Sequence, residues 1–226
     1  MRGLIIYDFD GVIGDSEVLA NEVLAALVSE LGVPTTREDS CRRYMGKRLA
    51  DVLAAVEAAT GRPAPPEFPA EIQARTLQRL RRDLVPVAGA REFIAAFADH
   101  PRCIASSSSP DRLAVCLEVL GLAEAFRDCV FSAATVPRGK PHPDIFLHAA
   151  RIMATDPADC IVIEDSAGGI EAARAAGMCA IGLLAGSHVQ PGHADRLSAA
   201  GAHHVAASFS AAEPIVSAFL RARAGA

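Results

Sequence analysis

The chain has 226 residues, of which 51% are hydrophobic and 22% charged, so it can bury a sizeable core over one or two domains and is not expected to be disordered. Its net charge of -5 gives no reason to expect general attraction to nucleic acid or to an anionic membrane. The longest weakly polar stretch, residues 175–186, is too short and too rich in glycine to span a bilayer, and the apolar run before Asp8 is shorter than an export signal requires. We therefore expect a cytoplasmic protein that binds neither membranes nor nucleic acid.

The six cysteines are spread along the chain, and no two are closer than thirteen positions. Without a CxxC pair a zinc site is not expected. Several cysteines lie in apolar runs, such as residues 102–105, where a reduced thiol behaves as a small hydrophobic side chain. This usage is typical of a cytosolic protein with free thiols.

The first third of the chain predicts one strand followed by helices. Residues 3–9 form a short apolar run that ends in acid, which indicates a buried strand. Thr36 and Asp39 have the spacing of a capping box and begin a second helix. No second strand is predicted before residue 102. The expected helices, separated by glycine and proline, cover residues 17–31, a segment from Thr36, 49–60 and about 70–83.

The remainder of the chain alternates between strands and helices. Strands separated by helices of this length form right-handed βαβ units and a parallel sheet. The predicted strands are 102–105, 129–132, 160–164, 179–183 and 203–206, and the predicted helices lie near 89–99, 110–120, 143–154, 167–176, 193–200 and after 210. We therefore expect a doubly wound, Rossmann-like α/β core (1–15 and 87–226) with a small all-helical cap (16–86) inserted after the first strand.

Two acidic pairs follow predicted strands. Asp8 and Asp10 come at the end of the first strand, and alternation places both on one face, where two carboxylates need a cation or a shared proton. Glu164 and Asp165 end the strand over 160–164, although Asp165 or Ser166 could equally cap the next helix. Ligands bind outside the carboxyl ends of parallel strands, and carboxylates there suit Mg²⁺.

Two further segments carry groups that suit phosphate. Ser106–Ser109 stand between a predicted strand and a helix that begins with Pro110, where hydroxyls and amides can bind an anion. Lys140, between Gly139 and Pro141, could present a cation to a phosphoryl group. Taken singly, each could be a plain turn or a solvated lysine. Together with the acidic pairs, they supply the groups that are needed to transfer a phosphoryl group through an aspartyl-phosphate intermediate.

Four ordered segments resemble the motifs of the haloacid dehalogenase superfamily, in its branch with a small helical cap. They are DFDGVIGDSE, the serine-rich strand end, KPHPDIF and IVIEDSAGGIEAARAAGM, and the resemblance covers nearly the whole chain. Among known members the chain is similar to phosphoglycolate and 6-phosphogluconate phosphatases and to β-phosphoglucomutase.

The resemblance implies roles for the acidic residues. Asp8 would be the nucleophile and a magnesium ligand. Asp10 would protonate the leaving alkoxide and then deprotonate the attacking water, while its backbone carbonyl binds the metal. Asp165 would be a third protein ligand, and Glu164 would hold a metal-bound water.

The resemblance also implies a phosphate site and an activity. Ser106 and the amide of Ser107 would bind the phosphoryl oxygens, and Lys140 would neutralise their charge. The expected activity is Mg²⁺-dependent hydrolysis of a small phosphate monoester, a sugar or sugar-acid phosphate, through a phospho-aspartyl intermediate. The partner would be a small phosphorylated metabolite, and we expect a monomer or weak dimer.

Several alternatives to a phosphatase share parts of this pattern. A metal-free dehalogenase of the same superfamily lacks an acid at the position of Asp10, and a receiver-type signalling domain is about half as long and has no cap. In β-phosphoglucomutase the cap carries a histidine near where this chain has Ala20 and an arginine near where it has Leu49. Because this chain lacks both side chains, mutase activity is less expected than phosphatase activity and is the runner-up. A non-catalytic binding protein stays open.

A basic cluster in the predicted cap bears on the choice of substrate. Arg42, Arg43, Lys47 and Arg48 surround a glycine, and Lys47 is one of two lysines in the chain. Such a cluster is either a solvated face or a clamp for a second anionic group of the substrate. We expect Arg43, Lys47 and Arg48 to determine substrate specificity.

Overall fold

The computed structural model describes residues 3–44 and 49–224. The chain forms two compact units, here called the α/β unit (residues 1–15 and 85–226) and the helical unit (residues 16–84). The helical unit follows the first strand and ends two residues before the boundary expected from the sequence. Within the described residues, no helix is both long and apolar enough to cross a membrane.

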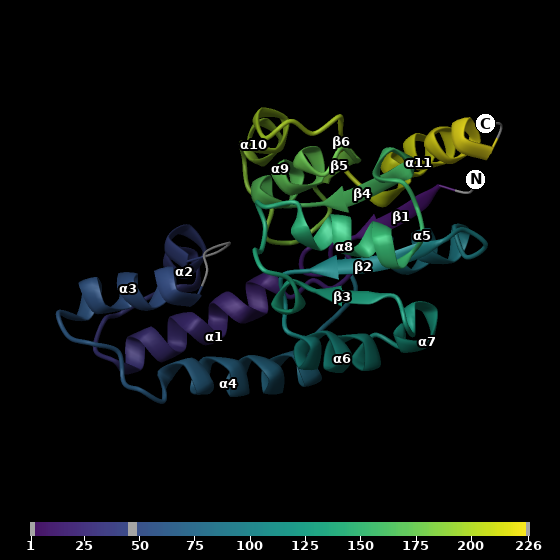
Figure 1. Ribbon diagram of the computed structural model, residues 1–226. Coiled ribbons are helices and arrows are strands. Elements are labelled where there is room, and N and C mark those ends of the chain that lie inside the picture. The colour runs from purple at the N-terminus through teal and green to yellow at the C-terminus, as the bar shows by residue number, and fades with distance from the viewer. Residues whose placement is uncertain (1–2, 45–48, 225–226) are drawn as a thin grey trace. The chain divides into compact units, whose positions relative to one another are not determined.

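A six-stranded parallel sheet forms the centre of the α/β unit (Figure 1), in the order β3-β2-β1-β4-β5-β6. β1 is central because it pairs with β2, with Tyr7 opposite Ile104, and with β4, with Tyr7 opposite Ile163. The predicted α/β fold class is confirmed. The strands are β1 (Leu4–Tyr7), β2 (Arg102–Ser106), β3 (Val130–Ser132), β4 (Cys160–Glu164), β5 (Cys179–Leu183) and β6 (His204–Ala206).

Helices cover both faces of this sheet. Leu4 and Ile6 of β1 lie in one buried cluster with Phe146 of α8 and Ile170 of α9. Tyr7 points to the other face, where its ring meets Phe93 of α5 edge to face, with centroids 6.2 Å apart. Strands buried on both faces read as continuous apolar runs, as LIIY does. The helices of this unit are α5 (Ala90–Ala96), α6 (Pro110–Val119), α7 (Ala123–Phe126), α8 (Asp144–Ile152), α9 (Ala167–Ala175), α10 (His193–Ala199) and α11 (Phe209–Ala224).

The helical unit has its own core. Leu27 and Val28 of α1 pack with Val56 of α3 and Phe68 of α4, and all four are buried. The predicted capping box forms, since the Asp39 amide donates to Thr36 Oγ1 (3.1 Å) and the Thr36 amide donates to Asp39 Oδ2 (3.3 Å). The helices are α1 (Glu17–Glu30), α2 (Arg37–Tyr44), α3 (Leu49–Thr60) and α4 (Phe68–Asp83).

The structure differs from the sequence-based expectation in short elements. Helix α5 ends at Ala96 rather than near residue 99, and α7 was not expected. Two short 3₁₀ turns, Ala133–Thr135 and Pro157–Asp159, were also missed. Elements of three or four residues are too short to show helical periodicity.

Candidate active site

Three carboxylates meet at the carboxyl ends of two central strands. Asp8 directly follows β1, Glu164 is the last residue of β4, and Asp165 comes next. All three are buried, and one ligand oxygen of each lies within 4.8 Å of the others. This proximity follows from the parallel pairing of β1 with β4, which brings the two strand ends to the same edge of the sheet.

Lys140 lies between two of these carboxylates. Its Nζ donates to Asp8 Oδ1 and to Glu164 Oε1, both at 2.6 Å, and to the carbonyl of Ala105 at 3.1 Å. Burial alone would lower the pKa of Lys140, but the charges of Asp8 and Glu164 outweigh burial and raise it. The side chain is therefore a buried ammonium ion whose three N–H groups are all used.

The charges at this site favour a divalent cation. Three buried carboxylates accompany one buried ammonium, so the group has an excess of negative charge. The pKa of Asp8 is raised well above its usual range, first by burial and further by Glu164 and Asp165, against the opposing effect of Lys140. A cation here would offset the repulsion among the carboxylates, and hard ions such as Mg²⁺ prefer sites whose donors are all oxygens. The residues present thus fit a metal ion.

Glu164 is fixed by the start of α9. Its Oε2 accepts hydrogen bonds from both the amide and the hydroxyl of Ser166, each at 2.8 Å. The Ser166 hydroxyl in turn accepts from the amide of Gly169 (3.0 Å), so Ser166 is the helix cap. A Cβ at position 169 would lie 1.7 Å from Glu164 Oε1, so this position leaves room for the carboxylate because it is glycine.

Asp10 is held by other partners. Its Oδ1 accepts from the guanidinium of Arg112 at 2.5 Å, and its Oδ2 accepts from the hydroxyls of Ser108 at 2.5 Å and Ser106 at 3.5 Å. Ser106, predicted to bind phosphate, is fully buried, whereas Ser107 is exposed. The carboxylate of Asp10 is thus hydrogen-bonded to the serine loop, Ser106–Ser109, at the end of β2.

The structure adds residues that the sequence did not single out. Arg112 lies in the first turn of α6, and its contact with Asp10 joins residues 102 positions apart, for which the sequence carried no local signal. His188 Nε2 lies 2.9 Å from Asp165 Oδ2, and His193 Nε2 lies 2.5 Å from the Asp165 carbonyl oxygen. Neither histidine belongs to a motif, so their spacing from Asp165 carried no signal.

The basic cluster of the helical unit is described in part. Arg43, one of the three residues predicted to determine specificity, is exposed near the end of α2. Lys47 and Arg48 lie outside the described residues.

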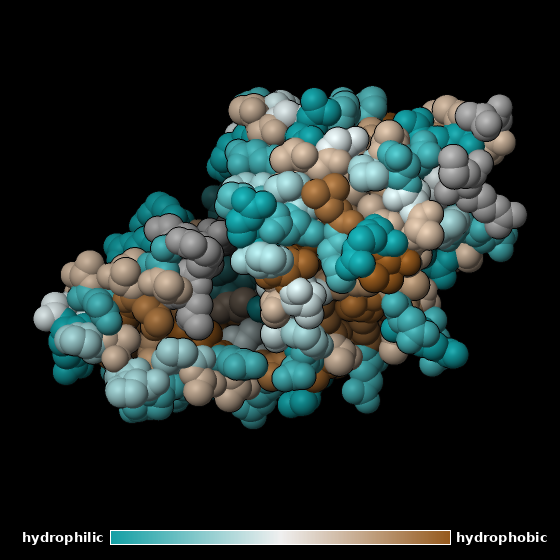
Figure 2. All heavy atoms as spheres, viewed as in Figure 1, coloured by the Kyte–Doolittle hydropathy of each residue, from teal (hydrophilic) through white to brown (hydrophobic). Residues whose placement is uncertain are grey.

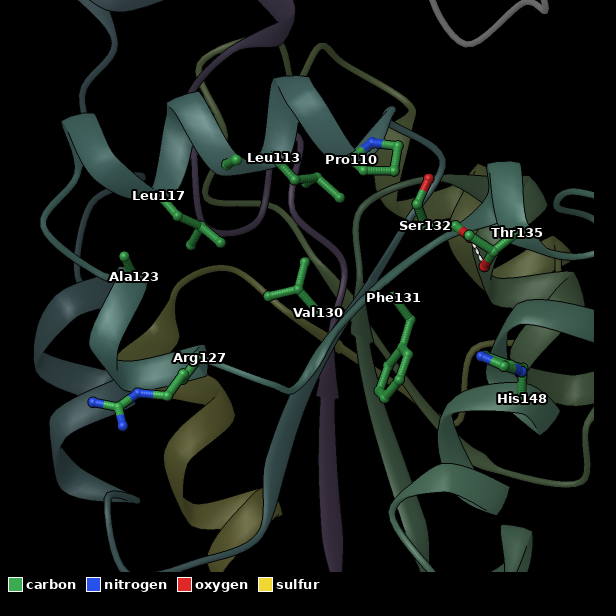
Figure 3. A pocket seen from close by; sticks show the side chains of 11 residues that line it. Pro110, Leu113, Leu117, Ala123, Arg127, Val130, Phe131, Ser132, Thr135 and His148 are labelled. Carbon is green, nitrogen blue, oxygen red and sulfur yellow. Dashed lines mark hydrogen bonds between the residues drawn. The ribbon is translucent and has the colours of Figure 1, made fainter.

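A cavity of about 570 Å³ lies elsewhere in the α/β unit, among α6, α7, β3 and α8. Its lining is mostly apolar, and Leu113 and Leu117 of α6 point toward Val130 of β3 (Figure 3). Figure 2 shows hydrophobic side chains gathered on the surface over β3. Ser132 connects this cavity to the serine loop, because its hydroxyl donates to the Ser108 carbonyl (2.6 Å). The lining is distinct from the charged residues at the strand ends.

Curated proteins similar to this chain include several that act on phosphorylated compounds. 6-Phosphogluconate phosphatase of Escherichia coli K12 is 26% identical over 83% of this chain and 85% of its own length. Hexitol phosphatase B of the same strain is 30% identical, covering 78% and 81%. β-Phosphoglucomutase of Bacillus subtilis is 28% identical, covering 79% and 82%.

Solved structures agree with this likeness. A haloacid dehalogenase-like protein of unknown function from Agrobacterium tumefaciens is 37% identical and superposes with a TM-score of 0.85, covering 96% of this chain and 99% of that one. A hydrolase of the same family from Deinococcus radiodurans, with bound phosphate and sodium, is 31% identical with a TM-score of 0.81, covering 97% of each chain. The family model of the haloacid dehalogenase-like hydrolases matches residues 3–177. The resemblance found in the sequence motifs is thereby confirmed, and the chain belongs to the haloacid dehalogenase-like hydrolases.

Proposed function

We propose that the protein is an Mg²⁺-dependent phosphatase that hydrolyses a small sugar or sugar-acid phosphate through an aspartyl-phosphate on Asp8. The observation that carries this proposal is the buried group of Asp8, Glu164 and Asp165 around Lys140 at the strand ends. The relatives named for 6-phosphogluconate and hexitol phosphatase activity support the substrate class.

In the first half of the reaction, a carboxylate oxygen of Asp8 attacks phosphorus while the bond to the leaving alkoxide breaks. Asp10 gives its proton to that alkoxide, which leaves as the alcohol. Lys140, charged and directed at Asp8, offsets negative charge next to the phosphoryl group. A bound Mg²⁺, held by Asp8, Asp165 and the Asp10 carbonyl with Glu164 nearby, would supply further positive charge.

In the second half, Asp10 takes a proton from water, whose oxygen attacks phosphorus. The bond between phosphorus and Asp8 breaks, which releases inorganic phosphate and restores the carboxylate. In the structure both oxygens of Asp10 accept hydrogen bonds, from Arg112 and Ser108. We infer that one of these bonds gives way when Asp10 carries its proton. Ser106 and the Ser107 amide are the proposed phosphate ligands.

The test is a panel of phosphate esters assayed for phosphate release with Mg²⁺. Wild-type protein should hydrolyse at least one sugar or sugar-acid phosphate, and Asp8→Asn should reduce turnover by several orders of magnitude while keeping its circular dichroism spectrum. Asp128→Asn, at an exposed position, is the matched control and should behave as wild type. Phosphate release by folded Asp8→Asn above a few per cent of wild type would overturn the proposal.

Two further arms separate the alternatives. Chelation should remove activity and Mg²⁺ should restore it, whereas Ca²⁺ should not, because it takes more ligands at longer distances than Mg²⁺. Activity that persists after chelation would favour a metal-free dehalogenase. With β-glucose 1-phosphate and a bisphosphate primer, we expect phosphate release or no reaction. Efficient formation of glucose 6-phosphate in a coupled assay would favour a mutase, the activity named for the Bacillus subtilis relative.

A further inference from the structure

Asp165 is held on two sides by histidines from the segment after β5. The Nε2 of His188 lies 2.9 Å from Asp165 Oδ2, and the Nε2 of His193 lies 2.5 Å from the Asp165 carbonyl oxygen. Both histidines are buried, at 6% and 8% exposure. The proposed reaction uses neither of them, so their burial against the carboxylate and the backbone carbonyl of Asp165 needs another explanation.

The space around the His188 ring depends on two glycines. A Cβ at Gly186 would lie 2.6 Å from His188 Cε1, and a Cβ at Gly11 would also lie 2.6 Å from that atom. Gly11 has φ of +77°, a left-handed conformation that other residues rarely adopt, and its Cβ would also lie 1.9 Å from Asp165 Oδ2. The backbone on both sides therefore leaves room for an imidazole placed directly against Asp165.

The direction of these hydrogen bonds follows from the partners. A carboxylate oxygen can only accept, so the 2.9 Å contact places a hydrogen on His188 Nε2, directed at Asp165 Oδ2. Arg196 donates to His193 Nδ1 at 2.8 Å, which leaves His193 Nε2 as the protonated nitrogen that donates to the Asp165 carbonyl. The rings of His188 and His193 pack edge to face, with centroids 5.7 Å apart. Asp165 is thus restrained at both its carboxylate and its backbone.

We propose that His188 is a positioning residue that fixes the carboxylate of Asp165 for binding of a divalent cation, an inference that rests on the proposed function. The bond to Oδ2 sets the rotation of the Asp165 carboxylate and presents it toward the oxygens of Asp8 and Glu164, which lie within 4.8 Å. Residues that orient metal ligands in this way typically contribute about 10- to 100-fold to metal affinity.

The experiment measures Mg²⁺ binding to the metal-free protein by isothermal titration calorimetry. His188→Leu fills the space without a donor and should weaken Mg²⁺ binding about 10- to 100-fold. His188→Gln can place an amide N–H near the position of Nε2 and should recover most of that loss. His204→Leu, which replaces an exposed histidine of β6, is the matched control and should bind Mg²⁺ as wild type does.

Each outcome bears on the proposal. Equal Mg²⁺ affinity in His188→Leu and wild type would overturn it, as would equal losses in the Leu and Gln variants when both keep the wild-type circular dichroism spectrum. For a His188→Leu protein that folds poorly, the His188→Gln titration decides: affinity within a few-fold of wild type supports the proposal, and a full loss overturns it. Wild-type protein that binds no Mg²⁺ also overturns it. Wild-type protein that binds Mg²⁺ but hydrolyses no ester would overturn the proposed function alone.

Discussion

Ion pairs of the same length differ between the two units of this chain in how far they are buried. Lys140 and Glu164 of the α/β unit are 2.6 Å apart, with side chains 7% and 1% exposed. Arg75 and Glu30 of the helical unit are also 2.6 Å apart, but their side chains are 40% and 53% exposed. The two pairs have the same N···O distance, but they differ in how much water surrounds their charges.

The difference shows what burial does to a charge. An exposed pair is screened by water and ions, and typically contributes about 0.2–1 kcal/mol. A buried pair has lost its hydration, so removing one partner leaves an uncompensated charge, which typically costs about 3–5 kcal/mol. The α/β unit keeps such charges at its strand ends, where the proposed reaction needs them, whereas the ion pairs described in the helical unit stay at least partly exposed to water.

The largest expected effect is from Lys140→Met. The carboxylates of Asp8 and Glu164 would then lie close together without their shared cation, so the free energy of unfolding should fall by about 3–5 kcal/mol. Urea denaturation followed by circular dichroism measures this change, and added Mg²⁺ should restore part of it. Arg138→Met is the control, because Arg138 pairs with Asp144 at 2.8 Å but is 58% exposed. Equal losses in the two variants would show that burial does not set the difference.

Next is a pair of adjacent glycines in α9. A Cβ at Gly169 would lie 1.7 Å from Glu164 Oε1 and must push that carboxylate away from Lys140, whereas a Cβ at Gly168 meets nothing within 4 Å. Gly169→Ala should therefore destabilise the protein by roughly 1–3 kcal/mol and reduce phosphate release. Gly168→Ala should be neutral or stabilising by up to about 1 kcal/mol. Thermal unfolding of both variants tests this, and similar melting temperatures would contradict the described position of Glu164.

The basic cluster of the helical unit provides a test of charges that we expect to act on the substrate rather than on stability. We propose that Lys47, with Arg43 and Arg48, binds a second anionic group of the substrate. A hydrogen bond to a charged group contributes ~1.5–3 kcal/mol, so Lys47→Ala should lower kcat/KM for a sugar-acid phosphate by roughly 10- to 100-fold. Hydrolysis of p-nitrophenyl phosphate should stay nearly unchanged. Equal losses on both substrates, or none on either, would show that the cluster is a solvated face.

The smallest expected effect is from Arg79→Ala in α4. Arg79 pairs with Glu22 at 2.7 Å and with Asp83 at 2.5 Å, and its side chain is 29% exposed. We expect the free energy of unfolding to fall by less than about 1 kcal/mol, and less still at high salt. A loss near that of Lys140→Met, measured by the same urea denaturation, would mean that the two units do not differ as described.

Much of the fold was predictable because its signals are local. The strands over 160–164 and 179–183 have the predicted bounds, and the others agree within a residue or two, since buried parallel strands read as apolar runs. The grouping of Asp8 with Glu164 and Asp165 was predictable in outline, because parallel strands bring their carboxyl ends to one edge. Contacts between residues far apart in the sequence left no such trace: Arg112 meets Asp10 across 102 positions.

The ends of the helical unit are joined within the α/β unit. The amide of Asp15 donates to the Val85 carbonyl at 3.0 Å, the amide of Val87 donates to the Ile13 carbonyl at 2.9 Å, and Gly14 forms an antiparallel bridge with Pro86. The chain therefore leaves the α/β unit and returns to it through two neighbouring backbone segments that are hydrogen-bonded to each other. A different insert could be spliced there with little additional loop-closure entropy. On our proposal that the basic cluster of the helical unit binds the substrate, exchanging this insert would change substrate preference while the carboxylates at the strand ends stay in place.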